Sequence, residues 1–136
     1  MTNVTPDPVR DFLRQQGASY QVIANGLRGL VENWERIVSM VVEGYSLSLD
    51  DYLNEMDGRQ LLENALGVAP GELREAFIGR VRDADMRIRL ALVPMGRCLW
   101  GRIVAEEEGW TEETNWWYFE RPRAPGPKLA EELKDF

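Results

Sequence analysis

The longest regular pattern in the chain is an apolar stripe between positions 19 and 45. Its members, three or four residues apart, are Ile23, Leu27, Leu30, Trp34, Ile37, Val41 and Tyr45. Because an α-helix turns once every 3.6 residues, this spacing puts all of them on one face. We predict one long helix that starts at Ser19. Gly26 and Gly29 weaken its first half or let another helix approach closely.

A second long stripe follows Pro70 and ends at Pro94. The positions that recur at helical spacing are Leu73, Phe77, Val81, Ala84, Ile88 and Leu92. We predict a helix that buries this face. Two aspartates each stand four residues before an arginine, the spacing that supports an exposed helical surface. The two pairs are Asp83 with Arg87 and Asp85 with Arg89.

Shorter helices are predicted from their start signals. Asp7 before Pro8 is typical of an N-cap followed by the first helical residue. The stretch 48–51, Ser-Leu-Asp-Asp, has the form of a capping box, and the stretch 57–60, Asp-Gly-Arg-Gln, repeats the device. We therefore predict two separate short helices here, the second of which begins at Asp57 and ends at Gly67.

The pattern changes after Pro94. Residues 95–100 are expected to be irregular or strand-like, and the aromatic run within 115–120 favours a short extended segment. Three prolines then predict an extended loop before a last short helix that begins near Pro127. Together the patterns predict one all-α domain over residues 1–136. It is a bundle of five or six helices, two long and several short, with an aromatic, partly extended C-terminal segment.

The residue types present exclude several kinds of chemistry. The chain has no histidine and one cysteine, Cys98, so Ser-His-Asp and Cys-His nucleophiles and His-containing zinc sites are excluded. We expect no cofactor and no metal, although carboxylate-only catalysis and oxygen-ligated Mg²⁺ or Ca²⁺ stay open. The acids Asp50, Asp51 and Glu55 are interpreted as a helix start rather than a metal site. Cys98 is interpreted as a small buried filler.

The expected location is the cytoplasm. No apolar run is long enough to span a membrane, and residues 1–11 lack the basic start and apolar core of a signal peptide. A single cysteine also excludes a fold held together by intramolecular disulfides. The chain contains 14 arginines and 2 lysines, a bias that suggests a GC-rich bacterial genome.

Charge is distributed unevenly and suggests the kind of partner. The net charge is −7, which argues against nucleic acid as a ligand. Residues 103–136 carry 9 acidic and 4 basic side chains. Acidic and aromatic residues of this region are our candidates for partner binding, although a solvated charge run and a buried aromatic cluster are the plainer interpretations. The candidates are Glu106, Glu107, Glu108, Trp110, Trp116, Trp117 and Arg121.

Several short motifs resemble a pattern found in small uncharacterised bacterial proteins. They are Glu43-Gly44-Tyr45, Leu49-Asp50-Asp51-Tyr52-Leu53-Asn54, Arg59-Gln60-Leu61-Leu62, Trp116-Trp117-Tyr118 and Pro125-Gly126-Pro127. Small acidic helical proteins of this general kind include immunity proteins and antitoxins, which neutralise a toxic enzyme. The resemblance implies a fold class and assigns no role to any residue.

Three functional hypotheses follow. The leading one is a non-catalytic inhibitor that binds a cognate, basic bacterial toxin. The alternative is a small-molecule-binding or carboxylate-dependent enzyme domain, with a pocket between the helices and Trp116 and Trp117. The third is a plain structural subunit. The sequence does not decide the oligomeric state.

Overall fold

The computed structural model describes residues 7–136. Residues 1–6, part of the stretch on which the signal-peptide prediction depends, lie outside the described residues. The helices are α1 (Pro8–Gln15), α2 (Tyr20–Gly44), α3 (Leu49–Val68), α4 (Gly71–Arg89), α5 (Arg102–Glu108) and α6 (Pro127–Leu133). A 3₁₀ turn, η1 (Trp116–Tyr118), and two short antiparallel strands, β1 (Leu92–Pro94) and β2 (Glu120–Pro122), complete the fold. The predicted all-α bundle is confirmed.

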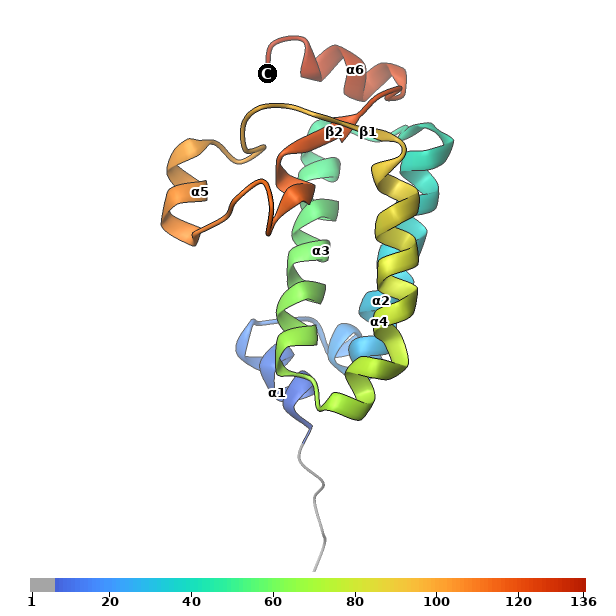
Figure 1. The fold of residues 1–136 in the computed structure, drawn as a ribbon, viewed down its shortest axis with the longest axis vertical. Helices are drawn as coiled ribbons and strands as arrows, with labels where there is room; N and C mark the ends of the chain where they lie inside the picture. Colours follow the sequence, from blue (N-terminus) through green and yellow to red (C-terminus); the bar gives the residue numbers. More distant parts are fainter. Residues whose placement is uncertain (1–6) are drawn as a thin grey trace, which may run out of the picture.

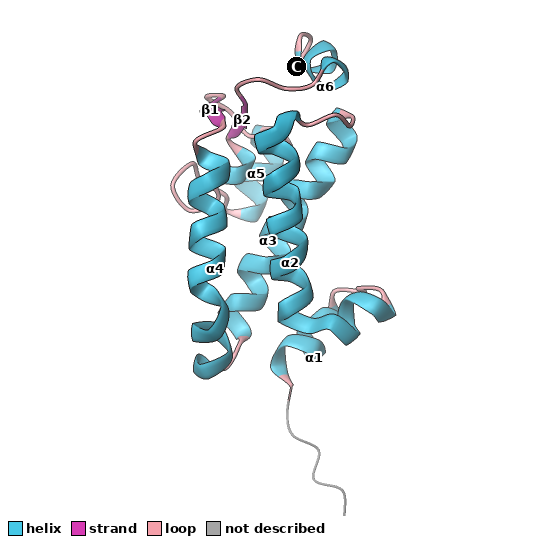
Figure 2. Ribbon diagram, turned by 90° about the vertical axis from the view of Figure 1, so that its right-hand side faces the viewer, coloured by secondary structure: helices cyan, strands magenta, loops and turns pink. Residues whose placement is uncertain are grey.

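Three long helices, α2, α3 and α4, run along the long axis of the molecule (Figure 1). The central helix is α2, which packs against both α3 and α4, whereas α3 and α4 make few direct contacts with each other. One end of the bundle is closed by α1, which contacts α2 and α3. The β1–β2 ribbon and α6 lie at the opposite end (Figure 2). Helix α5 stands beside α3, outside the bundle (Figure 1).

Helix α2 confirms the first long stripe, including its weak point. The Ser19 hydroxyl caps it by accepting from the backbone N–H of Val22 at 3.3 Å. At Gly26 the backbone leaves the helical region with φ 60° and ψ −149°, a conformation that favours glycine. The kink frees carbonyls of the preceding turn, and the Arg10 guanidinium donates to those of Ile23 and Ala24 at 3.1 and 3.0 Å. Helix α1 is thereby tied to the kink.

Helix α3 corrects the prediction of two short helices. The capping box at Ser48 and Asp51 is present, but the second start predicted at Asp57 is wrong, because the helix continues unbroken to Val68. Inside a helix the backbone amides at this point already donate to backbone carbonyls. The side chains of Asp57 and Gln60 therefore do not cap them and can bind other groups. Asp57 and Gln60 accept hydrogen bonds from the C-terminal segment instead.

The chain beyond α4 differs from the prediction in three places. The fourth helix ends at Arg89, so Leu92 belongs to a strand and not to the helix. The aromatic run forms a 3₁₀ turn rather than an extended segment, and the strand follows it at Glu120–Pro122. Helix α5, which contains the run of glutamates, was not predicted. The last predicted helix is confirmed as α6, with Pro127 in its first turn.

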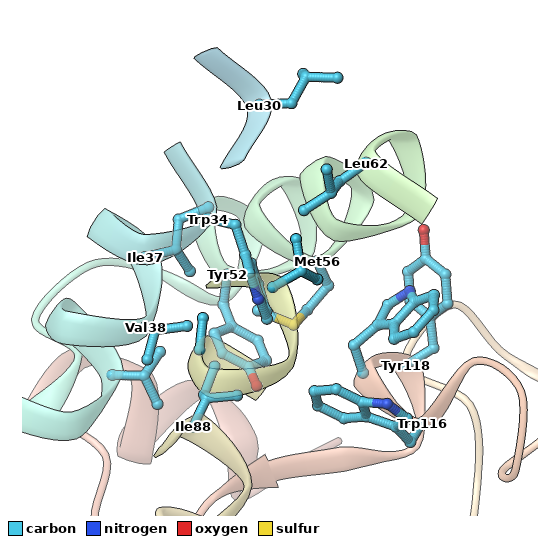
Figure 3. Close-up of a cluster of buried hydrophobic side chains, with 14 of the residues drawn as sticks. Leu30, Trp34, Ile37, Val38, Tyr52, Met56, Leu62, Ile88, Trp116 and Tyr118 are labelled. Atoms are coloured by element: carbon cyan, nitrogen blue, oxygen red, sulfur yellow. The ribbon is translucent and has the colours of Figure 1, made fainter. Parts of the chain in front are cut away.

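The main core surrounds Trp34, which is 1% exposed. Figure 3 shows its indole beside Tyr52 of α3 and Met56 one turn further along, with Ile88 of α4 close by. The helix stripes predicted from spacing supply most of this core, and Trp116 and Tyr118 of η1 complete it from the side. The prediction that Trp34 is a core residue is confirmed.

An ion pair is buried in this core. Arg59 of α3 is 4% exposed, and its Nε and Nη2 donate to the two carboxylate oxygens of Asp85 on α4 at 3.0 and 2.8 Å. The indole Nε1 of Trp34 donates to the same carboxylate at 2.9 Å. The prediction that Asp85 pairs with Arg89 on an exposed face is therefore wrong. Arg89 instead stacks over Trp116, 4.7 Å from the ring centroid.

Replacing Asp85 by asparagine should test this centre. Asp85→Asn keeps the size of the side chain but leaves the Arg59 charge buried without its counter-ion. We expect the free energy of unfolding, measured by urea denaturation, to fall by roughly 3 kcal/mol, the lower end of the usual range because Asp85 keeps some exposure. The matched control is Asp83→Asn at an exposed position of the same helix, which should change stability by less than about 0.5 kcal/mol. Equal effects would contradict the assignment.

Candidate functional site

The chain between the two strands, residues 95–119, forms a lobe on the side of the bundle (Figure 1). Side chains of α3 hold it in place. Oδ1 of Asp57 accepts from the indole Nε1 of Trp100 at 3.0 Å and from the Tyr118 hydroxyl at 2.7 Å. Oε1 of Gln60 accepts from Nδ2 of Asn115 at 2.8 Å. Both ends of the lobe are thus fastened to the same turn of α3.

Helix α5 is short because glycines bound it on both sides. Gly101 precedes it with φ 93° and Gly109 follows it with φ 73°, a left-handed conformation that ends helices. The helix buries Ala105 and turns its glutamates outward. We call the exposed acids of the lobe the acidic face. They are Glu106, Glu107, Glu108, Glu112 and Glu113.

Apolar surface lies beside the acidic face. Ile103 is 68% exposed and Trp100 is 39% exposed. The same lobe holds a cavity of about 360 Å³ between α5 and the loops on either side of it, and neither Ile103 nor Trp100 lines this cavity. Its apolar walls come from Cys98, Ala105, Trp110 and Phe119, and its charged rim from Arg97, Arg102, Glu106 and Glu112. The sequence pattern did not single out Ile103 or Trp100, because each belongs to a run of only three apolar residues, too short to show a helical or strand period.

Trp110 is the one aromatic candidate that reaches this cavity. It is half-buried and stacks on Tyr118, with ring centroids 4.0 Å apart and planes at 18°. Burial raises the pKa of the Tyr118 hydroxyl, and its hydrogen bond to Asp57 raises it further, so the phenol stays protonated as a donor. The indole of Trp110 therefore rests on a fixed support.

The other candidates lie elsewhere. Trp116 and Trp117 are 8% and 1% exposed, so they pack in the core of this structure. The plainer interpretation of these two indoles, a buried aromatic cluster, agrees with this placement. Arg121 is exposed on β2 and lines a different cavity with Val93 and Phe136. The lobe therefore brings together the three glutamates and Trp110 of the predicted set.

A further cavity, of about 310 Å³, lies between α3, α4 and the aromatic turn. Arg59, Trp116 and Trp117 line it. The sequence hypothesis of a small-molecule domain placed its pocket between the helices and these two tryptophans, and a cavity is present there. Nothing in the local sequence around Arg59 indicated that this arginine reaches it.

The carboxylates near the start of α3 do not converge on one site. Asp51 accepts from Ser48 in the capping box, and Asp50 is exposed in the first turn. Oε2 of Glu55 is buried with no hydrogen-bond donor among the described residues. Burial raises the pKa of the Glu55 carboxyl, while Arg36 lowers it and Asp51 adds to the rise. Cys98 is buried, as predicted, and burial raises the pKa of its thiol.

Comparison of the chain with protein-family models, with curated proteins and with solved structures finds no match. Across residues 7–136, none of the helices has the length and apolar character needed to cross a membrane. The fold therefore defines an all-α bundle, and the candidate functions depend on the lobe and the cavities themselves.

Glu55 offers a test through pH. Its pKa is raised in the folded state, so the folded chain holds this proton more tightly than the unfolded chain does. Stability from this group is present below the ordinary value of 4.5 and is lost as pH rises through the folded pKa. Glu55→Gln should remove that loss, so the variant gains stability over the wild type as pH rises to neutrality.

The measurement for Glu55 is urea denaturation over this pH range. Glu75→Gln, at an exposed position of α4, is the matched control and should follow the wild-type profile. A Glu55→Gln variant whose stability stays parallel to the wild type at every pH would contradict the assignment.

Proposed function

We propose that the protein is a non-catalytic binding protein that docks a basic partner protein on the lobe, in the manner of immunity-type or antitoxin-type inhibitors in the bacterial cytoplasm. The observation that carries the proposal is the acidic face, five exposed glutamates beside exposed Ile103 and Trp100 and an apolar cavity. Protein interfaces commonly combine an apolar centre with a polar, charged rim.

Charge supplies the first step of binding. Within residues 7–136 the glutamates of α5 have no buried cationic partner, and both side chains of the ion pair between Glu106 and Arg102, at 3.6 Å, are exposed to solvent. Exposed pairs of this kind contribute little energy and neutralise the surface weakly. The acidic face therefore attracts a positively charged surface and orients it during encounter.

Apolar contact supplies the second step. Ile103 and Trp100 remain exposed in a chain that buries its other tryptophans or half-buries them. The cavity of the lobe is bounded by the indole of Trp110, which rests on Tyr118, and it offers space for an apolar side chain of the partner. Contacts at such centres set the dissociation rate, while charges at the rim set the association rate.

Charge reversal on α5 tests the electrostatic step. Glu106→Lys, Glu107→Lys and Glu108→Lys combined should slow association with the partner by roughly ten-fold or more. The dependence of the rate on salt should largely disappear. All three side chains are exposed, so the melting temperature should change little. The partner is first captured from a lysate of the encoding organism, and rates are then measured by surface plasmon resonance.

The matched control for charge is Glu43→Lys, Glu75→Lys and Asp83→Lys combined, which makes the same change in net charge at exposed positions of α2 and α4. This variant should retain most of the association rate. Equal loss in both variants would indicate a general charge effect. A lysate protein retained equally by the wild type and the α5 variant would contradict docking on the acidic face.

Ile103→Asp tests the apolar step. Ile103 is 68% exposed, so the change should leave folding intact, but it places a charge at the proposed centre of the interface. We expect dissociation to accelerate by roughly ten-fold or more, since central interface contacts often contribute over 1 kcal/mol each. Val42→Asp, at a 47% exposed position of α2, is the control and should leave the rate unchanged. Equal dissociation rates for the two variants would remove Ile103 from the interface.

A further inference from the structure

Two side chains on the lining of the cavity between α3 and α4 carry buried donors that lack acceptors among the described residues. Arg59 donates through Nε and Nη2 to Asp85, but its Nη1 is buried and has no hydrogen-bond acceptor among the described residues. The side chain of Arg59 is only 4% exposed. The central carbon of its guanidinium lies 4.4 Å from the ring centroid of Trp117 and 5.8 Å from that of Trp34. The free edge of Arg59 is therefore held in a fixed orientation.

A second orphan donor belongs to the same cavity. The indole Nε1 of Trp117 is buried and also has no acceptor within residues 7–136. Trp117 and Arg59 both line the cavity, and the indole stacks against the guanidinium. A buried donor without an acceptor costs about 1–3 kcal/mol, and such groups are rare in folded proteins. Two such donors on side chains that line one cavity point to this cavity as a place for an oxygen acceptor.

The charged and apolar residues that line the cavity indicate what kind of ligand could supply this acceptor. Arg74 and Arg82 of α4 line it, are exposed, and form no ion pair in the described part of the chain. With Arg59 they put three arginines on a lining that also holds Asp85, Glu63 and Glu113, so the attraction for an anion comes from these two exposed arginines and not from a net positive charge of the cavity. Three apolar side chains complete the walls, namely Leu66, Ile78 and Val81.

Two acids oppose an anion. Glu113 lines the cavity, and a carboxylate oxygen of Glu63 lies 3.8 Å from Nη1 of Arg59, beyond hydrogen-bond distance. The Glu63 side chain is 42% exposed. The Glu63 carboxylate can move away from Nη1 and let another oxygen approach, because an exposed carboxylate remains hydrated outside the cavity.

We propose that this cavity binds a small organic carboxylate with an apolar body. The carboxylate oxygens accept from Nη1 of Arg59 and Nε1 of Trp117, and the body packs on the apolar walls. The volume of about 310 Å³ corresponds to roughly ten water molecules, which limits the ligand to a small acid. This site goes beyond the proposed docking of a protein on the lobe and depends on other residues.

The test uses benzoate as the probe, with benzamide and benzylamine as its neutral and cationic counterparts. Benzoate at millimolar concentration should raise the melting temperature of the intact chain in a saturable way, at constant ionic strength. In ¹⁵N-edited NMR spectra, the indole N–H signal of Trp117 should move downfield as it gains an acceptor. Benzamide should act more weakly, and benzylamine should have no effect.

Variants at exposed positions separate binding from folding. Arg74→Gln and Arg82→Gln should each weaken benzoate binding by about two- to five-fold, the range expected for one exposed charge. Arg87→Gln, at an exposed position of the same helix outside the cavity, should not. Glu63→Gln should strengthen binding, because it removes the opposing charge beside Nη1.

Three results would overturn the proposal. They are no movement of the Trp117 indole signal at saturating benzoate, equal stabilisation by benzamide, and equal weakening by Arg87→Gln. The variant with three lysines on α5 should bind benzoate like the wild type. If protein docking fails while benzoate still binds, only the proposal for the lobe is contradicted. If benzoate fails to bind while docking persists, only the proposal for the cavity is contradicted.

Discussion

The ion pair between Arg59 and Asp85 joins the two long helices that touch each other least. Helix α2 packs against α3 and against α4, but α3 and α4 make few direct contacts, so their relative position depends on side chains that reach across. The pair also receives the indole N–H of Trp34 and carries the ring of Trp117 on the guanidinium. Burying two charges is costly unless their hydrogen bonds are nearly complete. The need to complete these hydrogen bonds therefore sets both the spacing between α3 and α4 and the position of η1.

One turn of α3 organises both the core and the lobe. Arg59 points into the core, while Asp57 and Gln60 accept hydrogen bonds from Trp100, Tyr118 and Asn115. The sequence pattern of this turn predicts a helix start, since an aspartate followed by a glutamine three residues later is typical of a capping box. Local pattern cannot distinguish side chains that cap a helix from side chains that bind a distant segment. The difference lies in contacts across 43–61 positions of sequence.

The elements that periodicity predicts are those whose burial follows a single helix face. The stripes of α2 and α4 are of this kind, and the structure confirms them except at Leu92, which lies in β1. The capping box at Ser48 is confirmed as well, from its own start signal. The aromatic run was misassigned because β-propensity favours an extended chain. Tertiary packing instead tightens Trp116–Tyr118 into a 3₁₀ turn that fills the side of the core. Of the candidate binding residues, Glu106–Glu108 and Trp110 lie on the lobe, and Glu106 and Trp110 line one cavity there. The orphan donors of Arg59 and Trp117 could not be inferred, because an unpaired group is defined only by its surroundings.

The sequence of α5 contains several features that disfavour a helix. The helix has seven residues, fewer than an isolated helix needs to persist in water. Glu106, Glu107 and Glu108 occupy its last turn, where negative charge opposes the helix dipole. They also repel one another, and the single exposed pair with Arg102 offsets little of this. Lysines at these positions would favour the helix, and packing does not require acids there, since the buried residue is Ala105. A segment that departs from local preference without a gain in packing is where function is expected, and the proposed docking of a basic partner would account for this choice of residues.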